Sequence, residues 1–435
     1  MIILYVEVVL FFFLSASSSV FPLFNKKTPS KAHTNDVVKI VNGIKHKRLG
    51  GEGEIIVSEL GLGTQRWVSE DSNAPNEALC YDFLNKATSS GINLIDTAEQ
   101  YPIPSSSSNP EGLTETIIGN WIARSKGNRE KLVIASKITG SRNVCRANIF
   151  KDCENSLKRL QTDYLDVYLL HWPARYSPQS NWGQSLEYNH DAEKFYDGHA
   201  NFEEIVGAMG DLIKQGKIRG YGFCNDNCFG LTAASYTAKA MGVPPPICLQ
   251  NDYSLINRRI EENGVSEASS GIHLNAGFMA YNLLAGGILT GKYLQGPPIT
   301  VENPSLNDSQ QTRKYPRGRM DEIGWGRTLY RYRSGPAEAA TKAYQQIAEK
   351  NKISLTELAL RFPRERRAVT TSLIGHTSMK QLEESIRCFQ IDKSLPEQVL
   401  WDIDVVHMRN RLPIFSSTRV GRDWYGEGEI GERIP

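Results

Sequence analysis

The chain has 435 residues, of which 40% are hydrophobic and 23% charged, and its mean hydropathy is −0.38. A net charge of +2 gives no reason to expect binding to nucleic acid or to an anionic membrane surface. Its seven cysteines include no C-x-x-C pair and its eight histidines no H-E-x-x-H spacing, so we predict reduced cysteines and no metal site.

The first 40 residues differ in composition from the rest of the chain. Residues 1–13 are apolar apart from Glu7, are too few for an ordinary membrane-spanning helix, and resemble the apolar core of a signal peptide. The basic, hydroxylated stretch that follows has the composition of a transit peptide, and the two together resemble the bipartite leader of algae with secondary plastids. We therefore expect residues 1–40 to be a plastid-targeting leader. The alternative is a mispredicted gene start, with a cytoplasmic protein.

From residue 41 to residue 408, short apolar runs alternate with amphipathic segments, and residues 409–435 are predicted to form a C-terminal tail. A hairpin within residues 45–63 is expected to lead into a first strand. Seven further strands are predicted at residues 92–96, 131–137, 164–171, 218–224, 246–252, 274–282 and 368–375. Helices are predicted at residues 77–91, 113–127, 145–161, 202–216, 228–241, 260–271, 335–351, 354–365 and 377–389.

The strict alternation of strands and helices predicts an α/β fold. The strands are rich in Val, Ile and Leu throughout, which is typical of a parallel sheet covered on both faces. An open nucleotide-binding sheet should carry G-x-G-x-x-G after its first strand, but the nearest sequence, residues 61–66, lacks the third glycine. We therefore predict a single eight-stranded parallel (β/α)8 TIM barrel preceded by a hairpin.

Two long segments interrupt the alternation, at residues 173–201 after the fourth strand and residues 294–335 after the seventh. Loops on the C-terminal side of barrel strands build substrate pockets. Both segments are rich in aromatic residues, which favours a pocket over the alternative of two surface loops. The aromatic residues are Tyr176, Trp182, Tyr188, Phe195, Tyr196, Tyr315, Trp325, Tyr330 and Tyr332.

Four ionisable residues lie at or just after the ends of three successive predicted strands: Asp96, Tyr101, Lys137 and His171. A phenol is a weak acid at neutral pH, and a nearby ammonium would lower its pKa. Lys137 could supply that ammonium, and Asp96 could keep it charged. His171 could hold a substrate oxygen or share the proton. Each residue alone has an ordinary structural explanation, but together they favour a device that delivers a proton to a carbonyl oxygen.

Several ordered blocks of the sequence resemble the aldo-keto reductase family, and in particular its Tas-like branch. They include LGLGT, GINLIDTAEQY, EKLVIASK, SLKRLQTDYLDVYLLHWP and SLIGHTSMKQLEES, and the resemblance covers roughly residues 45 to 408. It implies a (β/α)8 barrel that binds NADP(H) across its mouth. It also implies a catalytic set of Asp96, Tyr101, Lys137 and His171, with Tyr101 as the general acid and Trp172 beside the substrate.

The same resemblance implies a path for the cofactor. Asn225 and Gln250 would bind the nicotinamide carboxamide, Tyr281 would stack on the ring, and the turn at residues 282–292 would cover the pyrophosphate. The turn at residues 375–385 would take the adenosine end. The full expected set is Gly63, Thr64, Cys224, Asn225, Gln250, Tyr281, Asn282, Leu283, Leu284, Gly286, Lys292, Gly375, Thr377, Gln381, Glu384 and Ser385.

Two departures from the family pattern affect the cofactor prediction. Cys224 replaces the serine that usually precedes the carboxamide-binding Asn, and a thiol forms weaker hydrogen bonds. No Arg or Lys stands at Thr377, near the expected 2′-phosphate, which leaves the preference for NADP over NAD open. Lys380, Arg331 and Arg333 are alternative cations for that phosphate.

The sequence thus predicts an NADPH-dependent enzyme that reduces an aldehyde or ketone to the alcohol and acts on a small-molecule carbonyl substrate. The alternative is a nucleotide-binding regulatory or scaffold subunit of the same fold with little turnover. An unrelated barrel hydrolase or aldolase would need a metal cluster or a phosphate site in place of the four residues. The oligomeric state is left open.

Overall fold

The computed structural model describes residues 32–415, apart from residues 52–53, 72, 125, 141–142, 178–187, 189–198, 295–317, 322–324 and 326–328. The chain divides into Met1–Ala32 and a large unit, His33–Pro435, which contains every helix and strand that is described. Most of the predicted leader, most of the predicted tail, and Trp182, Phe195, Tyr196 and Tyr315 therefore lie outside the described residues.

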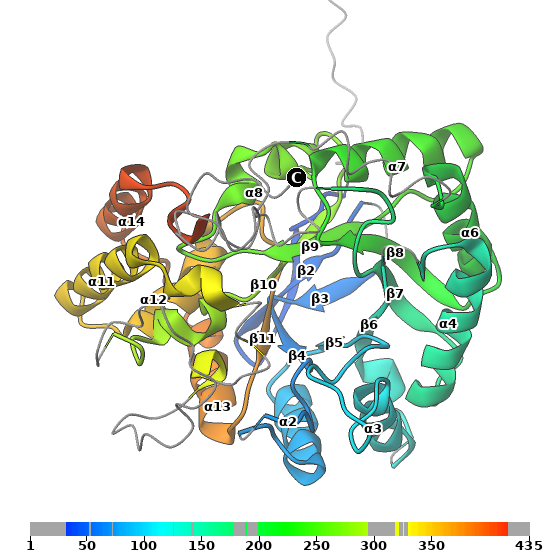
Figure 1. Ribbon diagram of the computed structural model, residues 1–435, viewed down its shortest axis with the longest axis horizontal. Helices are drawn as coiled ribbons and strands as arrows, with labels where there is room; N and C mark the ends of the chain where they lie inside the picture. Colours follow the sequence, from blue (N-terminus) through cyan, green and yellow to red (C-terminus); the bar gives the residue numbers. More distant parts are fainter. Residues whose placement is uncertain are drawn as a thin grey trace, which may run out of the picture. The chain divides into compact units, whose positions relative to one another are not determined.

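Eight parallel strands in the described residues close a barrel, which confirms the predicted TIM-barrel fold (Figure 1). Around the barrel the order is β10-β11-β4-β5-β6-β7-β8-β9, and β9 pairs again with β10. The strands are β4 (Leu60–Gly63), β5 (Leu94–Asp96), β6 (Val133–Ile138), β7 (Leu165–Leu170), β8 (Ile218–Cys224), β9 (Cys248–Asp252), β10 (Gly277–Tyr281) and β11 (Thr371–Gly375).

Successive residues of a strand point to opposite faces, and here both faces are buried, so the strands are apolar along their whole length. Val133 and Ala135 of β6 belong to the core inside the barrel, whereas Ile134 packs in the core between barrel and helices. Gly61 of β4 faces the crowded interior, because a Cβ atom there would lie 2.6 Å from the Leu373 side chain. A larger residue at this position would displace the barrel core.

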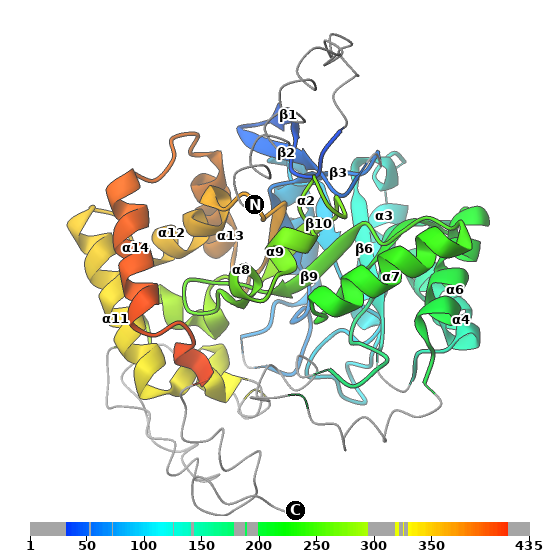
Figure 2. The same cartoon turned by 90° about the horizontal axis from the view of Figure 1, so that it is seen from above.

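An antiparallel sheet of β1 (Val37–Val41), β2 (Ile44–Arg48) and β3 (Ile56–Ser58) lies at the N-terminal ends of the barrel strands (Figure 2). Leu49, Ile55 and Val57 close the barrel interior from this side. The predicted hairpin is thus part of a three-stranded sheet. The predicted leader boundary at residue 40 falls inside β1, because the pairing of β1 with β2 begins at Val37.

Residues before β1 also contact the barrel. The Thr34 backbone N–H donates to Asn275 Oδ1 at 2.7 Å, and Asn35 Nδ2 donates to the carbonyl oxygen of Arg367 at 2.7 Å. We predict that a chain starting at Ala32 unfolds at the same temperature as the full chain. A chain starting at Asn42 should unfold several degrees lower, since each lost hydrogen bond costs about 1 kcal/mol and about 1 kcal/mol shifts Tm by roughly 2–4 °C. Thermal unfolding followed by circular dichroism checks this, and equal midpoints for the two chains would show that β1 adds no stability.

Helices cover the outside of the barrel. They are α2 (Glu77–Ser89), α3 (Leu113–Ala123), α4 (Arg146–Leu160), α6 (Phe202–Lys214), α7 (Cys228–Met241), α8 (Arg259–Glu262), α9 (Val265–Ala268), α11 (Gly335–Lys350), α12 (Leu355–Arg361), α13 (Met379–Gln390) and α14 (Glu397–Arg409). The single helix predicted at residues 260–271 is wrong, because Gly264 adopts φ 80° and separates α8 from α9. In the part of the chain that the structure describes, no helix is both long and apolar enough to cross a membrane.

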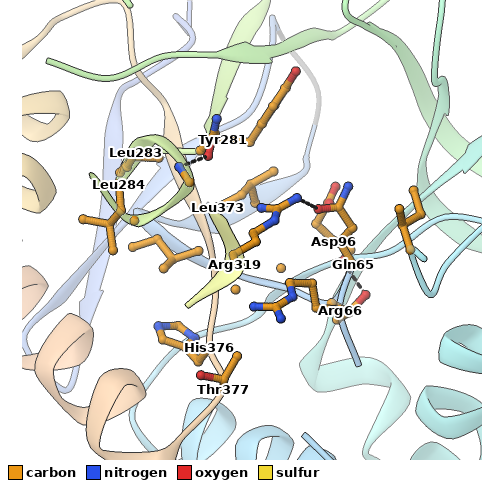
Figure 3. Close-up of a pocket in the computed structure, with 18 of the residues that line it drawn as sticks. Gln65, Arg66, Asp96, Tyr281, Leu283, Leu284, Arg319, Leu373, His376 and Thr377 are labelled. Atoms are coloured by element: carbon orange, nitrogen blue, oxygen red, sulfur yellow. Dashed lines mark hydrogen bonds between the residues drawn. The ribbon is translucent and has the colours of Figure 1, made fainter. Parts of the chain in front are cut away.

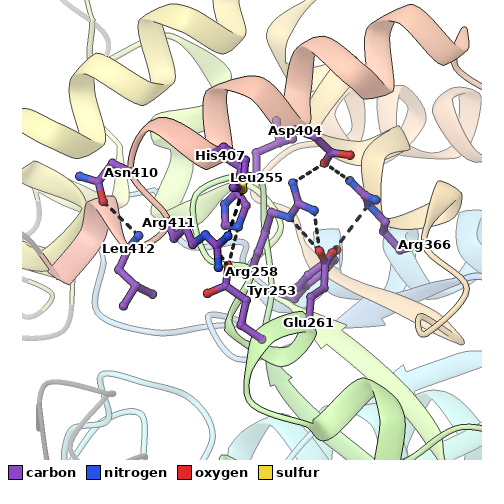
Figure 4. A network of polar contacts seen from close by, with 12 residues as sticks. Tyr253, Leu255, Arg258, Glu261, Arg366, Asp404, His407, Asn410, Arg411 and Leu412 are labelled. Carbon is purple, nitrogen blue, oxygen red and sulfur yellow. Dashed lines mark hydrogen bonds and ion pairs between the residues drawn. The ribbon is translucent and has the colours of Figure 1, made fainter.

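The helix α14 was not predicted from the sequence. It follows Pro396, has no side-chain N-cap, and buries Val399, Ile403 and Val406. Charged groups fix it to the rest of the protein, as Figure 4 shows. Asp404 receives hydrogen bonds of 2.7 Å from both Arg258 and Arg366.

Candidate active site

A cavity of about 710 Å³ opens at the C-terminal ends of the barrel strands, where enzymes of this fold carry their active sites. Figure 3 shows side chains from the turns after β4, β10 and β11 arranged around it. Every residue predicted for catalysis, cofactor or substrate lines this cavity except Lys137, which is fully buried. The lining residues from the prediction are Asp96, Tyr101, His171, Trp172, Gly63, Thr64, Cys224, Asn225, Gln250, Tyr281, Asn282, Leu283, Leu284, Gly286, Lys292, Gly375, Thr377, Gln381, Glu384 and Ser385.

Asp96 and Lys137 form a buried ion pair beside Tyr101. Asp96 is the last residue of β5, and Lys137 lies near the end of the neighbouring strand β6. Lys137 Nζ lies 2.8 Å from Asp96 Oδ2, donates to the carbonyl oxygen of Thr97 at 2.7 Å, and has no exposed surface. The same atom is 5.0 Å from the centre of the Tyr101 ring. The ammonium is therefore held by a carboxylate directly beside the phenol.

The two pKa shifts have opposing causes. Burial raises the pKa of the Tyr101 phenol, and the Lys137 ammonium opposes this only in part. Lys137 therefore lowers this pKa, as expected from the sequence, but burial has the larger effect and the net shift is upward. Burial would also lower the pKa of Lys137, but attraction to Asp96 outweighs it and raises that pKa. At neutral pH the site thus holds a protonated phenol beside an ammonium.

His171 and Trp172 follow β7 and line the cavity next to Tyr101. The His171 ring meets the Tyr101 ring edge-on at 5.7 Å between centroids, and it stacks on Trp172 at 6.2 Å. Burial, reinforced by the charge of Lys137, holds the pKa of His171 well below its ordinary value. Its Nδ1 atom is buried and contacts no hydrogen-bonding group in the described residues. The imidazole is therefore neutral at neutral pH.

Gln250 connects the predicted carboxamide-binding residues to the ion pair. Its Nε2 atom donates to Asp96 Oδ1 at 2.7 Å, the carboxylate oxygen that Lys137 leaves free. Since an ionised carboxylate can only accept, this contact fixes the orientation of the amide. The Cys224 thiol then donates to Gln250 Oε1 at 3.3 Å. This contact between Gln250 and Asp96 was not predicted from the sequence.

Asn225 and Tyr281 are also joined by a hydrogen bond. Asn225 has φ 57°, in the left-handed region that Asn tolerates better than most residues. Its Nδ2 atom donates to the His171 carbonyl oxygen at 2.9 Å, and its Oδ1 atom accepts from the Tyr281 hydroxyl at 2.5 Å. The side chains of β8, β9 and β10 are thereby fixed around one side of the cavity.

The turn after β10 brings backbone close to the cavity. Gly286 and Gly287 adopt φ 66° and 99°, which other residues rarely adopt. Asn282 Oδ1 accepts a hydrogen bond of 2.9 Å from the Gly286 N–H and stabilises the turn. A Cβ atom on Gly286 would lie only 3.2 Å from Leu329, in the second long loop. This loop therefore packs against the turn, and its Arg319, Trp325, Leu329 and Arg331 line the cavity as expected of a pocket loop.

The turn after β11 leads into α13. Ser378 caps this helix by accepting from the Gln381 N–H, and the Gln381 side chain accepts from the Thr377 N–H at 2.8 Å. Ser385 is buried and bonds to His376 Nε2 at 3.0 Å. The start of a helix presents N–H groups that favour an anion, so the geometry is compatible with a phosphate nearby.

Arg66 and Arg319 line the cavity but were not among the predicted residues. Arg66 forms an ion pair of 2.5 Å with Asp71. Arg319 donates to Gln65 Oε1 at 2.7 Å, and its guanidinium carbon lies 3.6 Å from the centre of the Trp325 ring. The Nε atom of Arg319 is buried and contacts no acceptor in the described residues. Arg66 directly follows the sequence LGLGTQ, so its place at the end of the first barrel strand could have been used to predict it as a site residue. Arg319 lies in an irregular loop, where no sequence pattern indicates a place in the site.

Arg331, considered above as a cation for the 2′-phosphate, also lines the cavity. It forms a buried ion pair of 2.8 Å with Asp252. Lys380 is exposed and does not line the cavity. In the described residues, no group of three or more His, Cys, Asp or Glu side chains could hold a metal ion.

Comparisons with known proteins show the family to which the chain is similar. The model of the Aldo/keto reductase family matches residues 59–406. Protein tas from Escherichia coli strain K12 is 36% identical over 374 residues, covering 82% of this chain and 96% of that protein, and Protein tas from Shigella flexneri matches equally. An Aldo-keto reductase from Babesia bovis is 33% identical over 297 residues, covering 65% of this chain and 98% of that protein. The chain belongs to the aldo/keto reductase family, whose members are oxidoreductases acting on carbonyl substrates.

Proposed function

We propose that this protein is an NADPH-dependent reductase that converts an aldehyde or ketone into the alcohol, with Tyr101 as the general acid. The observation that carries the proposal is the Lys137 ammonium, held by Asp96 beside the Tyr101 phenol at the wall of the cavity. A subunit that only binds a nucleotide has no need of a charge buried at this point, and burying one is costly.

The residues around the cavity fit a nicotinamide cofactor. An amide group has two N–H donors and an oxygen with two lone pairs. The bonds of Gln250 to Asp96 and Cys224 leave one N–H and one lone pair for a carboxamide. Asn225 Oδ1 likewise keeps a lone pair beside its bond to Tyr281. When bound, a reduced nicotinamide supplies the hydride that carbonyl reduction requires.

Tyr101 and His171 would act on the substrate oxygen. Both line the cavity, and both are neutral at neutral pH because burial shifts their pKa values away from the charged form. Tyr101 donates its proton to the oxygen as negative charge develops there. Lys137 stabilises the phenolate that remains, and an N–H of His171 holds the oxygen in place. Asp96 thus holds the Lys137 ammonium next to the phenol that donates the proton.

Cations near the turns support binding of the cofactor phosphates. Arg66, Arg319 and Lys292 all line the cavity. Arg319 lies in the wall of the cavity, where Gln65 and Trp325 orient its guanidinium group. No carboxylate of the described residues forms an ion pair with it there. We propose that Arg66 and Arg319 pair with phosphate oxygens. A 2′-phosphate adds negative charge to this positive region, which favours NADP(H) over NAD(H) despite Thr377.

The proposal is tested by titrating the purified protein with NADPH and with NADH while following its tryptophan fluorescence. The protein is then mixed with each nucleotide and with a panel of aldehydes and ketones. Oxidation of the nucleotide is followed by the loss of absorbance of its reduced form. The proposal predicts tighter binding of NADPH and turnover with at least one carbonyl class. Tight NADPH binding with no turnover across the panel would favour the regulatory alternative.

A further prediction concerns the turn after β11. Replacing Gln381 and Glu384 with Ala should weaken NADPH binding, since each lost hydrogen bond costs on the order of 1–3 kcal/mol. The rate at saturating NADPH should stay nearly constant, because remote contacts act equally on ground and transition states. Arg387→Ala, an exposed residue of α13 outside the cavity lining, is the matched control. If the double variant bound NADPH as tightly as this control, the nucleotide would not reach α13.

A further inference from the structure

The helix α14 carries an exposed apolar stripe on the side facing away from the core. Trp401 is 67% exposed, Val405 39% and Met408 60%. Their spacings of four and three residues place them in one row along the helix. The opposite side of the helix is buried through Val399, Ile403 and Val406. The stripe is therefore a second apolar face, additional to the one that holds α14 on the barrel.

The orientation of this stripe is fixed by polar contacts that α14 makes with the rest of the protein. Asp404 accepts hydrogen bonds of 2.7 Å from Arg258 and Arg366, and His407 Nε2 lies 2.8 Å from Glu262 Oε1 (Figure 4). A rigid helix loses little conformational entropy when a partner covers its outer face. An exposed Trp beside an exposed Met on such a helix is typical of interface residues.

The charges next to the stripe complement a second copy of the same helix. Glu397 lies exposed at the start of α14, and Arg409 and Arg411 lie exposed at and after its end. Arg411 borders the stripe, because its Nη2 atom is 3.3 Å from Met408 Sδ. Its Nε atom lies 3.8 Å from Glu262 Oε1, and its side chain remains 55% exposed. In an antiparallel pair, Trp401 would face Met408 of the second copy and Glu397 would lie near its Arg411. A parallel pair would bring like charges together.

We propose that two copies of this protein associate through α14, packed antiparallel about a two-fold axis close to Val405. Trp401 of one copy packs against Met408 of the other in a sulfur–aromatic contact, and the Val405 side chains of the two copies pack against each other. Glu397 and Arg411 of opposite copies form the outer ion pairs, and the antiparallel helix dipoles are compatible with them. A single helix pair buries less than the roughly 1,200 Å² of ordinary stable interfaces, so we expect a dissociation constant of about 1–100 μM.

Sedimentation velocity of the full chain over about 1–100 μM, around this expected constant, tests the proposal. We expect the mean mass to rise from one to two copies with concentration. Trp401→Glu and Met408→Glu should each keep the protein monomeric, while Tyr236→Glu, on another helix and 62% exposed, should not. Circular dichroism confirms that each variant is folded.

The antiparallel arrangement has its own test. Glu397→Arg alone and Arg411→Glu alone should each weaken the association about tenfold or more, and the two together should restore it. A wild-type protein that stays monomeric at every concentration would overturn the proposal. The stripe on α14 would then have to be covered by another segment of the same chain. If Trp401→Glu still formed dimers and Tyr236→Glu did not, the interface would lie elsewhere than α14. This result would also overturn the proposal.

Discussion

Replacing Tyr101 with Phe is expected to lower kcat for carbonyl reduction by about 100-fold or more, while NADPH affinity stays near the wild-type value. The substitution removes only the hydroxyl that would donate the proton. The ring that packs edge-on against His171 stays, as does the ion pair of Lys137 with Asp96. Steady-state kinetics with a saturating carbonyl and a fluorescence titration with NADPH separate the two effects.

The matched control for Tyr101→Phe is Tyr221→Phe. Tyr221 is buried in β8 and donates to the Pro244 carbonyl oxygen at 3.0 Å, outside the cavity lining. Its loss should affect stability but not the rate per folded molecule. A Tyr101→Phe enzyme with nearly normal kcat would show that the proton comes from another group.

Replacing Lys137 with Met is expected to reduce turnover by about 100-fold or more and to shift the pH dependence of the reverse reaction. Alcohol oxidation needs the phenolate of Tyr101, so its rate rises with pH in the range below the phenol pKa. The Lys137 ammonium lowers that pKa against the effect of burial. Without the ammonium the pKa is higher, and the rise in rate should move to higher pH.

The variant also leaves Asp96 buried without its ion-pair partner, which costs about 3–5 kcal/mol of stability. Combining Lys137→Met with Asp96→Asn removes both charges and should recover part of this loss without recovering turnover. Lys137→Arg keeps a cation and should retain more of the wild-type pH profile. An active Lys137→Met enzyme whose profile is unchanged would show that Lys137 does not set the acidity of Tyr101.

The barrel could be predicted from the sequence because its strands are buried on both faces and therefore apolar throughout. The ends of α8 and α9 could not, because a single residue, Gly264, decides whether one helix continues. The helix α14 was missed because one face is apolar against the core and another is apolar toward solvent, which obscures the helical period.

The strand-end residues of the site could be predicted because a barrel brings all strand ends to one face. Lys137 and Asp96 then meet as neighbours on paired strands. The place of Arg319 depends on an irregular loop, and the bond of Gln250 to Asp96 on side-chain geometry, so neither follows from spacing. The direction of the Tyr101 pKa shift depends on how burial compares with one nearby charge, which a sequence does not quantify.

Isotope transfer shows directly whether this site reduces a carbonyl. The protein is supplied with NADPH carrying deuterium at both C4 positions and with the carbonyls of the panel, and the products are identified by mass spectrometry. We expect an alcohol that carries one deuterium on the former carbonyl carbon, formed far more slowly by Tyr101→Phe. If NADPH bound tightly but no carbonyl gave a deuterated alcohol, this site would not be a carbonyl reductase.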